Sequence, residues 1–123
     1  MTPFKEKVLN FVSMVPAGNV VSYGQVAAMI GVPRASRAVG GVLHEFGDKY
    51  PWWRVISSSG RISTKCEEHT ALMQKDLLQK EGVVVGKNLT VDIEKFRFIP
   101  SLNELKNLSL SQEDIEYILG KYF

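Results

Sequence analysis

The chain has 123 residues, of which 45% are hydrophobic and 23% are charged, so it suits one globular domain and neither a disordered nor a fibrous protein. Its formal net charge is only +2, and its single cysteine, Cys66, cannot form an internal disulfide bond. No apolar run approaches the roughly 20 residues of a membrane-spanning helix, and the first residues lack the apolar region of a signal peptide, so we expect a protein that is kept inside the cell.

Three helices are predicted in the first part of the chain. In the first of them, apolar residues recur three and four positions apart, which is the period of one helical face. Ser22 carries a hydroxyl suited to cap the second helix, and Gly31-Val32-Pro33 stops it, because the residue before a proline is disfavoured in the helical conformation. Two short helices around a glycine-containing turn form a helix-turn-helix pattern, which also occurs in proteins that never bind DNA. The expected limits are Phe4–Val15, about Tyr23–Ile30, and a third helix that begins near Arg34 to Ser36 and continues to His44, with a turn at Pro16–Asn19 and an extended piece at Val20–Val21.

The remainder of the chain combines short extended pieces with two further helices. Gly82 is the expected C-terminal stop of the clearer helix, and Ser111 followed by Asp114 resembles a capping box that opens the last one. The segment Pro100–Leu108 fits neither pattern clearly. The expected limits are Trp53–Ile56 for an extended segment before a turn at Ser57–Gly60, Glu67–Glu81 for the clearer helix, Val83–Val91 for a β hairpin or wing that bends at Gly86 to Asn88, and about Ser111–Leu119 for the last helix.

Three sequence segments carry a family resemblance. They read Val21-Ser22-Tyr23-Gly24-Gln25-Val26-Ala27, Ala35-Ser36-Arg37-Ala38-Val39-Gly40-Gly41 and Pro51-Trp52-Trp53-Arg54-Val55-Ile56. In this order and with these gaps they resemble the DNA-binding and active-site domain of the O6-alkylguanine-DNA alkyltransferases. The resemblance implies a mainly α fold, namely a winged-helix or helix-turn-helix domain with a small β wing or hairpin, over residues 1–99. Residues 100–123 then form a C-terminal extension, expected to be helical, that either packs back on the domain or offers a partner surface.

The third segment departs from the alkyltransferases at the residue that does the chemistry. Those enzymes carry Pro-Cys-His-Arg-Val, in which the cysteine accepts the alkyl group and the histidine works with a glutamate to activate it. This chain has Trp52 and Trp53 at the two positions and Glu81 at that of the glutamate. An indole is no nucleophile comparable with a thiolate, so we expect no alkyl transfer and no enzyme. Tryptophan in place of the cysteine is typical of the alkyltransferase-like proteins, which bind alkylated DNA and hand the lesion to nucleotide excision repair, although most of them keep the histidine.

The resemblance also assigns DNA-binding roles to the first two segments. A protein that inspects a damaged base must rotate the nucleotide out of the duplex and fill the hole. Arg37 would replace the extruded base, and Tyr23 would press on the phosphate 3′ of it. The small residues Ala38, Gly40 and Gly41 would let the helix approach the groove. Without the resemblance, Arg37 also fits a phosphate contact on a solvated face, Tyr23 fits half-buried packing, and the small residues fit tight helix packing.

The pocket for the extruded base is expected around the third segment. Trp52 would form its floor, and Arg54 would hold the loop by hydrogen bonds to backbone carbonyls. Lys65 falls where the alkyltransferase-like proteins place a cation against the base, and Ser63 and Thr64 are candidates for hydrogen bonds to the nucleotide. The full set of expected DNA- and lesion-binding residues is Tyr23, Arg34, Arg37, Ala38, Gly40, Gly41, Pro51, Trp52, Trp53, Arg54, Ser63, Thr64 and Lys65.

The expected partners are double-stranded DNA containing O6-alkylguanine and nucleotide excision repair proteins. We expect a monomer without membrane contact, in the cytoplasm, at the nucleoid or in a eukaryotic nucleus. We expect no cofactor and no metal, since His44 and His69 make no plausible ligand set. Two alternatives stay open: a winged-helix regulator without lesion specificity, and an active alkyltransferase that uses another acceptor such as Cys66.

Overall fold

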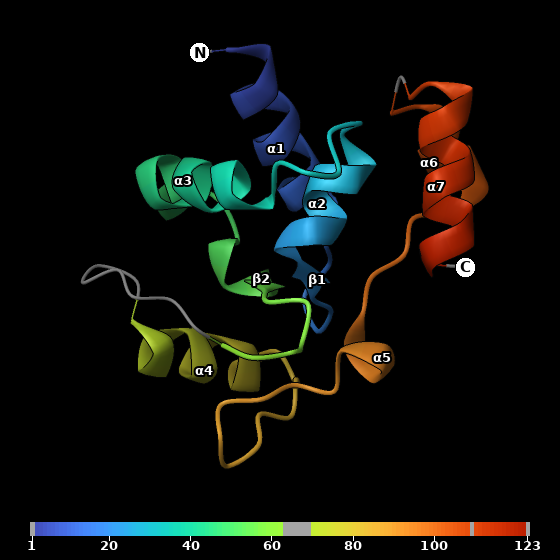
Figure 1. The fold of residues 1–123 in the computed structure, drawn as a ribbon. Coiled ribbons are helices and arrows are strands. Elements are labelled where there is room, and N and C mark those ends of the chain that lie inside the picture. The colour runs from blue at the N-terminus through green and yellow to red at the C-terminus, as the bar shows by residue number, and fades with distance from the viewer. Residues whose placement is uncertain (1, 63–69, 109, 123) are drawn as a thin grey trace.

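The computed structural model describes residues 2–62, 70–108 and 110–122 and is mainly helical, which confirms the expected fold class (Figure 1). Within these residues no helix combines the length and the apolar character needed to cross a membrane. The helices and strands are α1 (Pro3–Met14), β1 (Val21–Ser22), α2 (Tyr23–Met29), α3 (Ser36–Phe46), β2 (Val55–Ile56), α4 (Ala71–Lys80), α5 (Ile93–Phe96), α6 (Leu102–Lys106) and α7 (Gln112–Tyr122), with 3₁₀ turns at Gly47–Lys49 and Trp52–Arg54.

Helices α1, α2 and α3 pack against one another and form the main core. The side chain of Thr2 caps α1 by accepting a hydrogen bond from the Lys5 N–H. The apolar face of α1 that the sequence predicted is the buried one, and Phe11 and Val12 are at most 1% exposed. The predicted limits of α1 and α2 are correct to within one residue, whereas α3 continues beyond His44.

A two-stranded parallel sheet places the segment after α3 next to the start of α2. Val21 lies opposite Val55, and Ser22 lies opposite Ile56. Parallel strands need a long crossover connection, and here α2 and α3 together supply it. The sheet therefore fixes the third sequence segment against the helix-turn-helix.

Part of the expected extended segment Trp53–Ile56 is not a strand. Residues Trp52–Arg54 form a 3₁₀ turn in which the Arg54 N–H donates to the Pro51 carbonyl at 3.1 Å, and only Val55–Ile56 pairs as a strand. Proline fixes the backbone at the start of this turn, and the sequence pattern of apolar residues could not distinguish the turn from a strand.

The β wing expected over residues 83–91 is also not formed. The described residues there contain no strand. A single bridge joins Thr90 to Arg61, and the Gly86 N–H closes a turn by donating to the Thr90 carbonyl at 2.7 Å. The first and last valines of the segment are both buried beside Leu78 in a second core cluster instead of alternating along paired strands. The prediction of a bend at Gly86 is confirmed, but the prediction of a hairpin is wrong.

Helix α4 begins later than the sequence pattern predicted. Thr70 is extended, and its side chain caps the helix by accepting a hydrogen bond from the Met73 N–H at 3.1 Å. The helix therefore starts at Ala71, and residues 67–69 of the expected range lie outside the described residues. It ends as predicted near Gly82, whose φ of 90° is the left-handed conformation that favours glycine.

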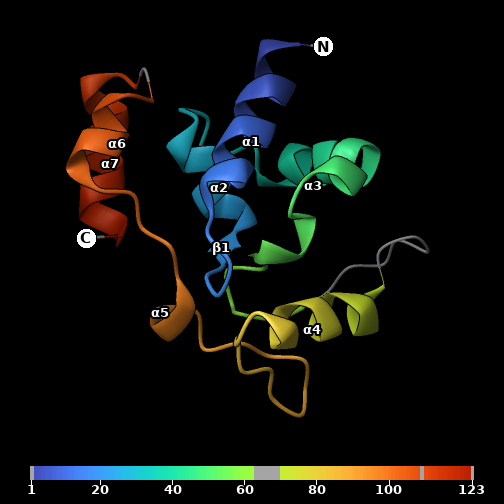
Figure 2. The ribbon, with the colours of Figure 1, turned by 180° about the vertical axis from the view of Figure 1, so that it is seen from behind.

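The C-terminal residues pack back onto α2, as Figures 1 and 2 both show. Reciprocal hydrogen bonds between Ser111 and Asp114 open α7, as predicted, and the helix continues to Tyr122. Leu105 and Ile118 belong to the main core cluster and are 1% and 0% exposed. Of the two possibilities left open for this extension, the structure therefore shows the packed one.

Candidate nucleic-acid interface

The helix-turn-helix expected from the sequence is present, and its turn is held by backbone hydrogen bonds. The Val32 N–H donates to the Ala27 carbonyl at 2.9 Å, and the Ala35 N–H donates to the Val32 carbonyl at 2.9 Å. Gly31, which precedes Val32 in this turn, adopts a φ of 87°, a conformation that other residues rarely accept. These contacts fix the direction in which α3 leaves the turn.

The outer face of α3 carries Arg37 together with small residues. Arg37, Ala38 and Gly41 are exposed, whereas Val39 is fully buried in the main core. Arg34 is exposed in the turn that precedes the helix. The face therefore presents a guanidinium group beside residues that have small side chains or none. Such a surface lets the helix backbone approach a nucleic-acid groove closely.

The two glycines of α3 differ in their surroundings. A Cβ atom at Gly40 would lie 3.8 Å from Cε1 of Tyr23, which is an ordinary contact. A Cβ atom at Gly41 would meet no atom within 4 Å. Glycine inside a helix is less favourable than alanine by roughly 0.5–1 kcal/mol. Packing within the described chain therefore gives no reason for a glycine at position 41.

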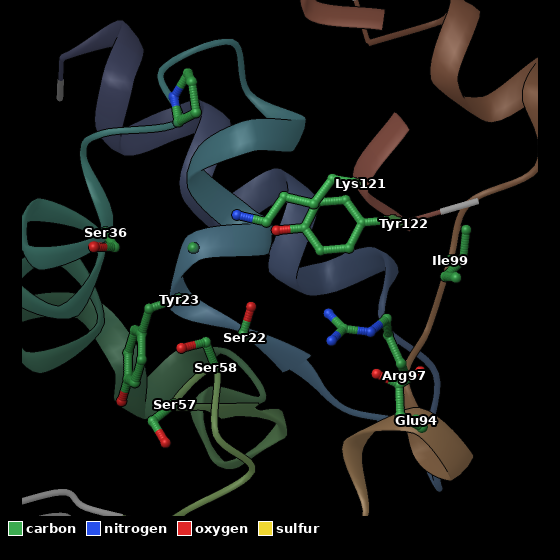
Figure 3. A pocket seen from close by; sticks show the side chains of 12 residues that line it. Ser22, Tyr23, Ser36, Ser57, Ser58, Glu94, Arg97, Ile99, Lys121 and Tyr122 are labelled. Atoms are coloured by element: carbon green, nitrogen blue, oxygen red, sulfur yellow. The ribbon is translucent and has the colours of Figure 1, made fainter. Parts of the chain in front are cut away.

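Tyr23 lies at the junction of the two helices. It is the first residue of α2, is half-buried, and packs toward Gly40 of α3. Burial raises the pKa of its phenol, so the hydroxyl remains protonated and uncharged at neutral pH. Tyr23 and Ser36, the first residue of α3, border one cavity of about 620 Å³ (Figure 3).

The same cavity contains residues that the sequence analysis missed. Arg97, which follows α5, and Lys121 and Tyr122, at the end of α7, line the side opposite Tyr23 (Figure 3). No local spacing marks these residues, because contacts distant in sequence bring them beside the helix-turn-helix. The packing of α7 against α2 places Lys121 and Tyr122, and the bridge between Val20 and Arg97 places Arg97.

The Pro51-Trp52-Trp53-Arg54 segment places its two tryptophans differently. Trp52 is only 8% exposed and belongs to the main core cluster, whereas Trp53 is half-buried, and their rings meet edge to face with centroids 6.1 Å apart. Pro51, Trp53 and Arg54 line a second surface pocket of about 430 Å³ that does not include Trp52. The free protein thus holds Trp52 in the interior, and its place on the floor of a lesion pocket stays a prediction.

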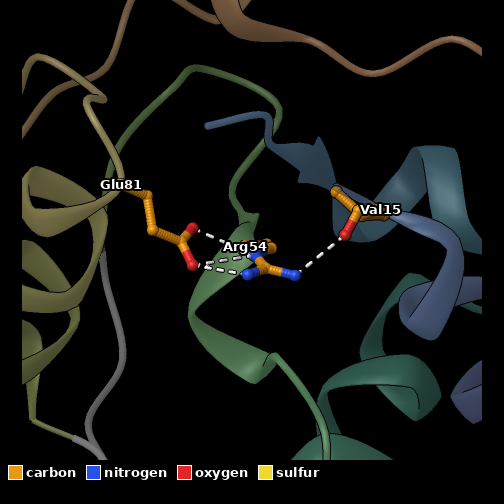
Figure 4. Close-up of polar contacts among 3 residues, drawn as sticks. All are labelled: Val15, Arg54 and Glu81. Carbon is orange, nitrogen blue, oxygen red and sulfur yellow. Dashed lines mark hydrogen bonds and ion pairs between the residues drawn. The ribbon is translucent and has the colours of Figure 1, made fainter. Parts of the chain in front are cut away.

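Arg54 ties this turn to two other parts of the chain (Figure 4). Its Nη1 donates to the Val15 carbonyl at 2.9 Å, which is the backbone-carbonyl role expected for it. Its Nε donates to Oε1 of Glu81 at 3.0 Å, and its Nη2 donates to Oε2. The two side chains are only 16% and 14% exposed. The sequence analysis missed this ion pair, although a buried glutamate requires a cation or donors nearby.

The environment of Glu81 keeps it ionised. Burial raises the pKa of its carboxyl, but the hydrogen bonds and charge of Arg54 outweigh that effect and leave the pKa below its usual value. The Trp53 indole N–H and the Gly18 backbone N–H contribute in the same direction. The geometry of the indole N–H is nevertheless not that of a hydrogen bond, so among the described residues Trp53 Nε1 is a buried donor without a partner.

Some expected site residues lie outside the described residues. These are Ser63, Thr64 and Lys65, predicted to contact the extruded nucleotide, and Cys66 and His69, considered as an alternative acceptor and its neighbour. In the part of the chain that the structure describes, no group of three or more histidine, cysteine or acidic residues is placed to hold a metal ion.

Comparison with known proteins places the helix-turn-helix in a family. The family described as 6-O-methylguanine DNA methyltransferase, DNA binding domain, matches residues 3–83. A DNA base-flipping protein of Escherichia coli K12 is 37% identical over 97 residues, which cover 77% of this chain and 74% of that protein. Alkyltransferase-like protein 1 of Schizosaccharomyces pombe is 37% identical over 87 residues, which cover 69% and 81% of the two proteins.

Solved structures agree with these sequence relatives. The crystal structure of S. pombe Atl1 in complex with damaged DNA containing O6-carboxymethylguanine matches with a TM-score of 0.75 at 31% identity, over 81% of this chain and 98% of that chain. The Mycobacterium tuberculosis O6-methylguanine methyltransferase matches with a TM-score of 0.56 at 30% identity, over 66% of this chain and 49% of that chain. This chain belongs to the alkyltransferase-like proteins, which share the DNA-binding domain of the O6-alkylguanine-DNA alkyltransferases.

Proposed function

We propose that this chain binds duplex DNA containing O6-alkylguanine, rotates the modified nucleotide out of the stack, and leaves the alkyl group in place. The observation that carries this proposal is Trp52 at the position of the acceptor cysteine, on a domain whose exposed helix presents Arg37. Binding without transfer makes the protein a lesion sensor and not an enzyme.

The exposed face of α3 suits the DNA-binding step. Arg37 has a planar guanidinium that can stack in the hole left by the extruded base and donate to the orphaned partner base at the same time. Ala38 and Gly41 place no bulky side chain on this face of α3, so the duplex can approach the helix backbone. Tyr23 is uncharged and borders the start of α3, where it can press on a phosphate without repelling it.

The residues around Trp52 offer no route for alkyl transfer. Neither indole can supply the lone pair of a thiolate, and the segment Pro51-Trp52-Trp53-Arg54 has Trp53 where the alkyltransferases carry the activating histidine. The Glu81 carboxylate is already paired with Arg54, so it stabilises the turn instead of activating a nucleophile.

The burial of Trp52 has a consequence for the bound state. If the extruded base lies against this ring, binding must uncover it, because only 8% of its surface is exposed in the free protein. In a Trp53→Phe variant Trp52 is the remaining tryptophan. Its fluorescence should change on adding a duplex with O6-methylguanine and stay constant with the matched guanine duplex. If the fluorescence of Trp52 changes with neither duplex, Trp52 does not line the lesion pocket.

We also propose that the bound lesion is handed to nucleotide excision repair. A protein that holds an alkylated base without repairing it needs a second activity to remove the damage. The family resemblance supplies this partner, and a slower loss of O6-methylguanine in cells that lack the protein, but only when excision repair is intact, is the expected result.

The central test compares affinities for two duplexes of identical sequence, one with O6-methylguanine and one with guanine. The protein should bind the first more tightly, and Arg37→Ala should abolish that preference, because the guanidinium acts only when the base is extruded. Arg34→Ala is the matched control, since Arg34 is an exposed arginine outside α3. It should change both affinities by the same factor. Equal affinity of the unmodified protein for the two duplexes would refute lesion recognition.

The buried Trp52 also supports a second candidate, a winged-helix regulator without lesion specificity. Such a protein uses the same exposed α3 but needs no pocket for an extruded base. Selection of a consensus site from random undamaged DNA, without any preference for O6-methylguanine, distinguishes it from the lesion sensor.

A further inference from the structure

The cavity beside Tyr23 joins the helix-turn-helix to the C-terminal part of the chain. Its walls come from the start of α2, the start of α3, the turn after β2, the segment after α5 and the end of α7 (Figure 3). Arg97 and Lys121 lie on one side, and Tyr23 and Ser36 lie on the other. The family match ends at residue 83, so both cations come from outside it.

Arg97 is held in place before any ligand arrives. Its Nη1 donates to Oε1 of Gln25 at 2.9 Å, and Gln25, which is 0% exposed, donates in turn to the Phe98 carbonyl at 2.6 Å. The guanidinium also lies 5.1 Å from the ring centroid of Tyr122. A guanidinium fixed by these neighbours loses little freedom when it binds an anion, which favours binding.

Lys121 adds a second positive charge at the edge of the cavity. Its Nζ donates to the Tyr117 hydroxyl at 3.2 Å, and it lies 5.9 Å from the ring centroid of Tyr122. The hydrogen bond to Tyr117 raises the pKa of the ammonium, with further contributions from the charges of both tyrosines. The side chain is exposed, so its charge is available to a ligand.

The chemistry of the remaining wall suits a phosphate. Ser57 and Ser58 contribute hydroxyl donors, and Tyr23 contributes an uncharged phenol. Glu94 is the acidic residue of the lining, so the two cations leave an excess of one positive charge. Arginine, lysine, serine and tyrosine are among the side chains that contact the sugar-phosphate backbone of DNA in protein complexes.

We propose that Arg97 and Lys121 bind the phosphodiester backbone of the DNA strand that contacts Tyr23 and Ser36, so that the C-terminal segment enlarges the DNA interface. The proposal rests on the DNA binding of the proposed function but not on its lesion specificity. The occupant is DNA because the cavity is continuous with the start of α3, the helix that carries Arg37. Backbone contacts carry no sequence or lesion information, so these cations raise the affinity for damaged and undamaged duplexes equally.

The test is a salt titration of DNA affinity for the full chain and for Lys121→Gln. Loss of one phosphate contact should lower the slope of log K against log salt by about 0.9 and weaken binding roughly eightfold at 0.1 M salt. Both the O6-methylguanine and the guanine duplex should lose the same factor. Lys121→Glu should weaken binding further. Arg97→Lys, which keeps the charge but loses the guanidinium geometry at Gln25, should weaken binding less than Arg97→Gln.

A matched control is Lys106→Gln, which removes one charge from an exposed lysine of α6 that does not line the cavity. It should leave the slope unchanged. An unchanged affinity and slope in both Lys121 variants would overturn the proposal even if lesion preference is observed. A reduced slope together with equal affinity for the two duplexes would refute the lesion sensor but support this inference. Absence of all DNA binding would refute both.

Discussion

Replacing Gly41 by alanine should make the protein more stable and a poorer DNA binder. The position is in the middle of α3, and the added Cβ would meet no atom within 4 Å, so no steric penalty opposes the gain in helix propensity. That gain is roughly 0.5–1 kcal/mol, which corresponds to a rise in melting temperature of about 2–5 °C for a domain of this size.

The same methyl group stands on the face that should meet the DNA. If the duplex approaches the α3 backbone closely, one extra methyl forces a shift that costs about 1 kcal/mol or more, and DNA affinity falls at least about fivefold. Thermal unfolding measured by circular dichroism and DNA binding measured by fluorescence anisotropy give the two quantities.

Gly120→Ala is the control for this substitution. A Cβ atom at Gly120 of α7 also meets no atom within 4 Å, so this variant should gain stability without losing DNA affinity. The reasoning about α3 is refuted if Gly41→Ala gains stability and binds DNA as tightly as the unmodified protein. Such a result would mean that DNA binding does not require the duplex to approach the α3 backbone closely at this position.

Further predictions concern the turn after α3 and its neighbours. Arg54→Ala leaves the Glu81 carboxylate buried without its cation and should lower the free energy of unfolding by about 3 kcal/mol in urea titrations; a loss below about 1 kcal/mol would mean that the pair is of little importance. Because the folded pKa of Glu81 is lowered, its stabilising contribution is complete above its usual pKa of 4.5 and is lost as the pH falls through the folded value. Glu81→Gln should therefore lose less stability on acidification than the unmodified protein, and parallel curves of stability against pH would contradict the assignment. Trp52→Cys should take up no methyl group from O6-methylguanine DNA, because no histidine follows to activate the thiol, and a gain of one methyl in the intact mass would show otherwise. Gly60→Ala would place a Cβ atom 2.2 Å from a backbone carbonyl oxygen at a φ of 84°, so it should destabilise the fold by at least about 2–4 kcal/mol, and a normal melting temperature would show that the turn differs from the structure.

The elements predicted correctly are those defined by local signals. The spacing of apolar residues located α1, and its Phe11 and Val12 are buried as that spacing requires. Ser22 caps α2, and the pair Ser111 and Asp114 opens α7. Each signal acts within one or two turns of chain, so it can be detected without knowledge of the rest of the fold.

The errors arise where contacts distant in sequence decide the structure. Residues 83–91 contain enough β-branched side chains to suggest a hairpin, but Val83 and Val91 are buried in a core cluster beside Leu78 of α4, and Val84 is exposed. The same limit applies to the site. Arg54 and Glu81 are 27 positions apart. Arg97 is brought to the cavity beside Tyr23 by the pairing of its backbone with Val20, which is also distant in sequence, so no spacing rule identifies either pair.

Trp52 shows that the sequence identifies a residue type without revealing its exposure. The sequence identifies the residue type at the acceptor position, which determines the chemistry, but not its burial, which determines how a base can reach it. Residue type is visible in the sequence, whereas exposure depends on every element that packs around the ring.

Isolation of the complex with a duplex containing O6-methylguanine tests the central claim most directly. The complex is purified by gel filtration, the protein is weighed as an intact molecule, and the DNA is digested to measure the remaining O6-methylguanine. We expect an unchanged protein mass and full recovery of the modified base from the bound DNA. A protein heavier by one methyl group, with a matching loss of O6-methylguanine, would contradict the claim that Trp52 leaves this protein able to bind the lesion but unable to repair it.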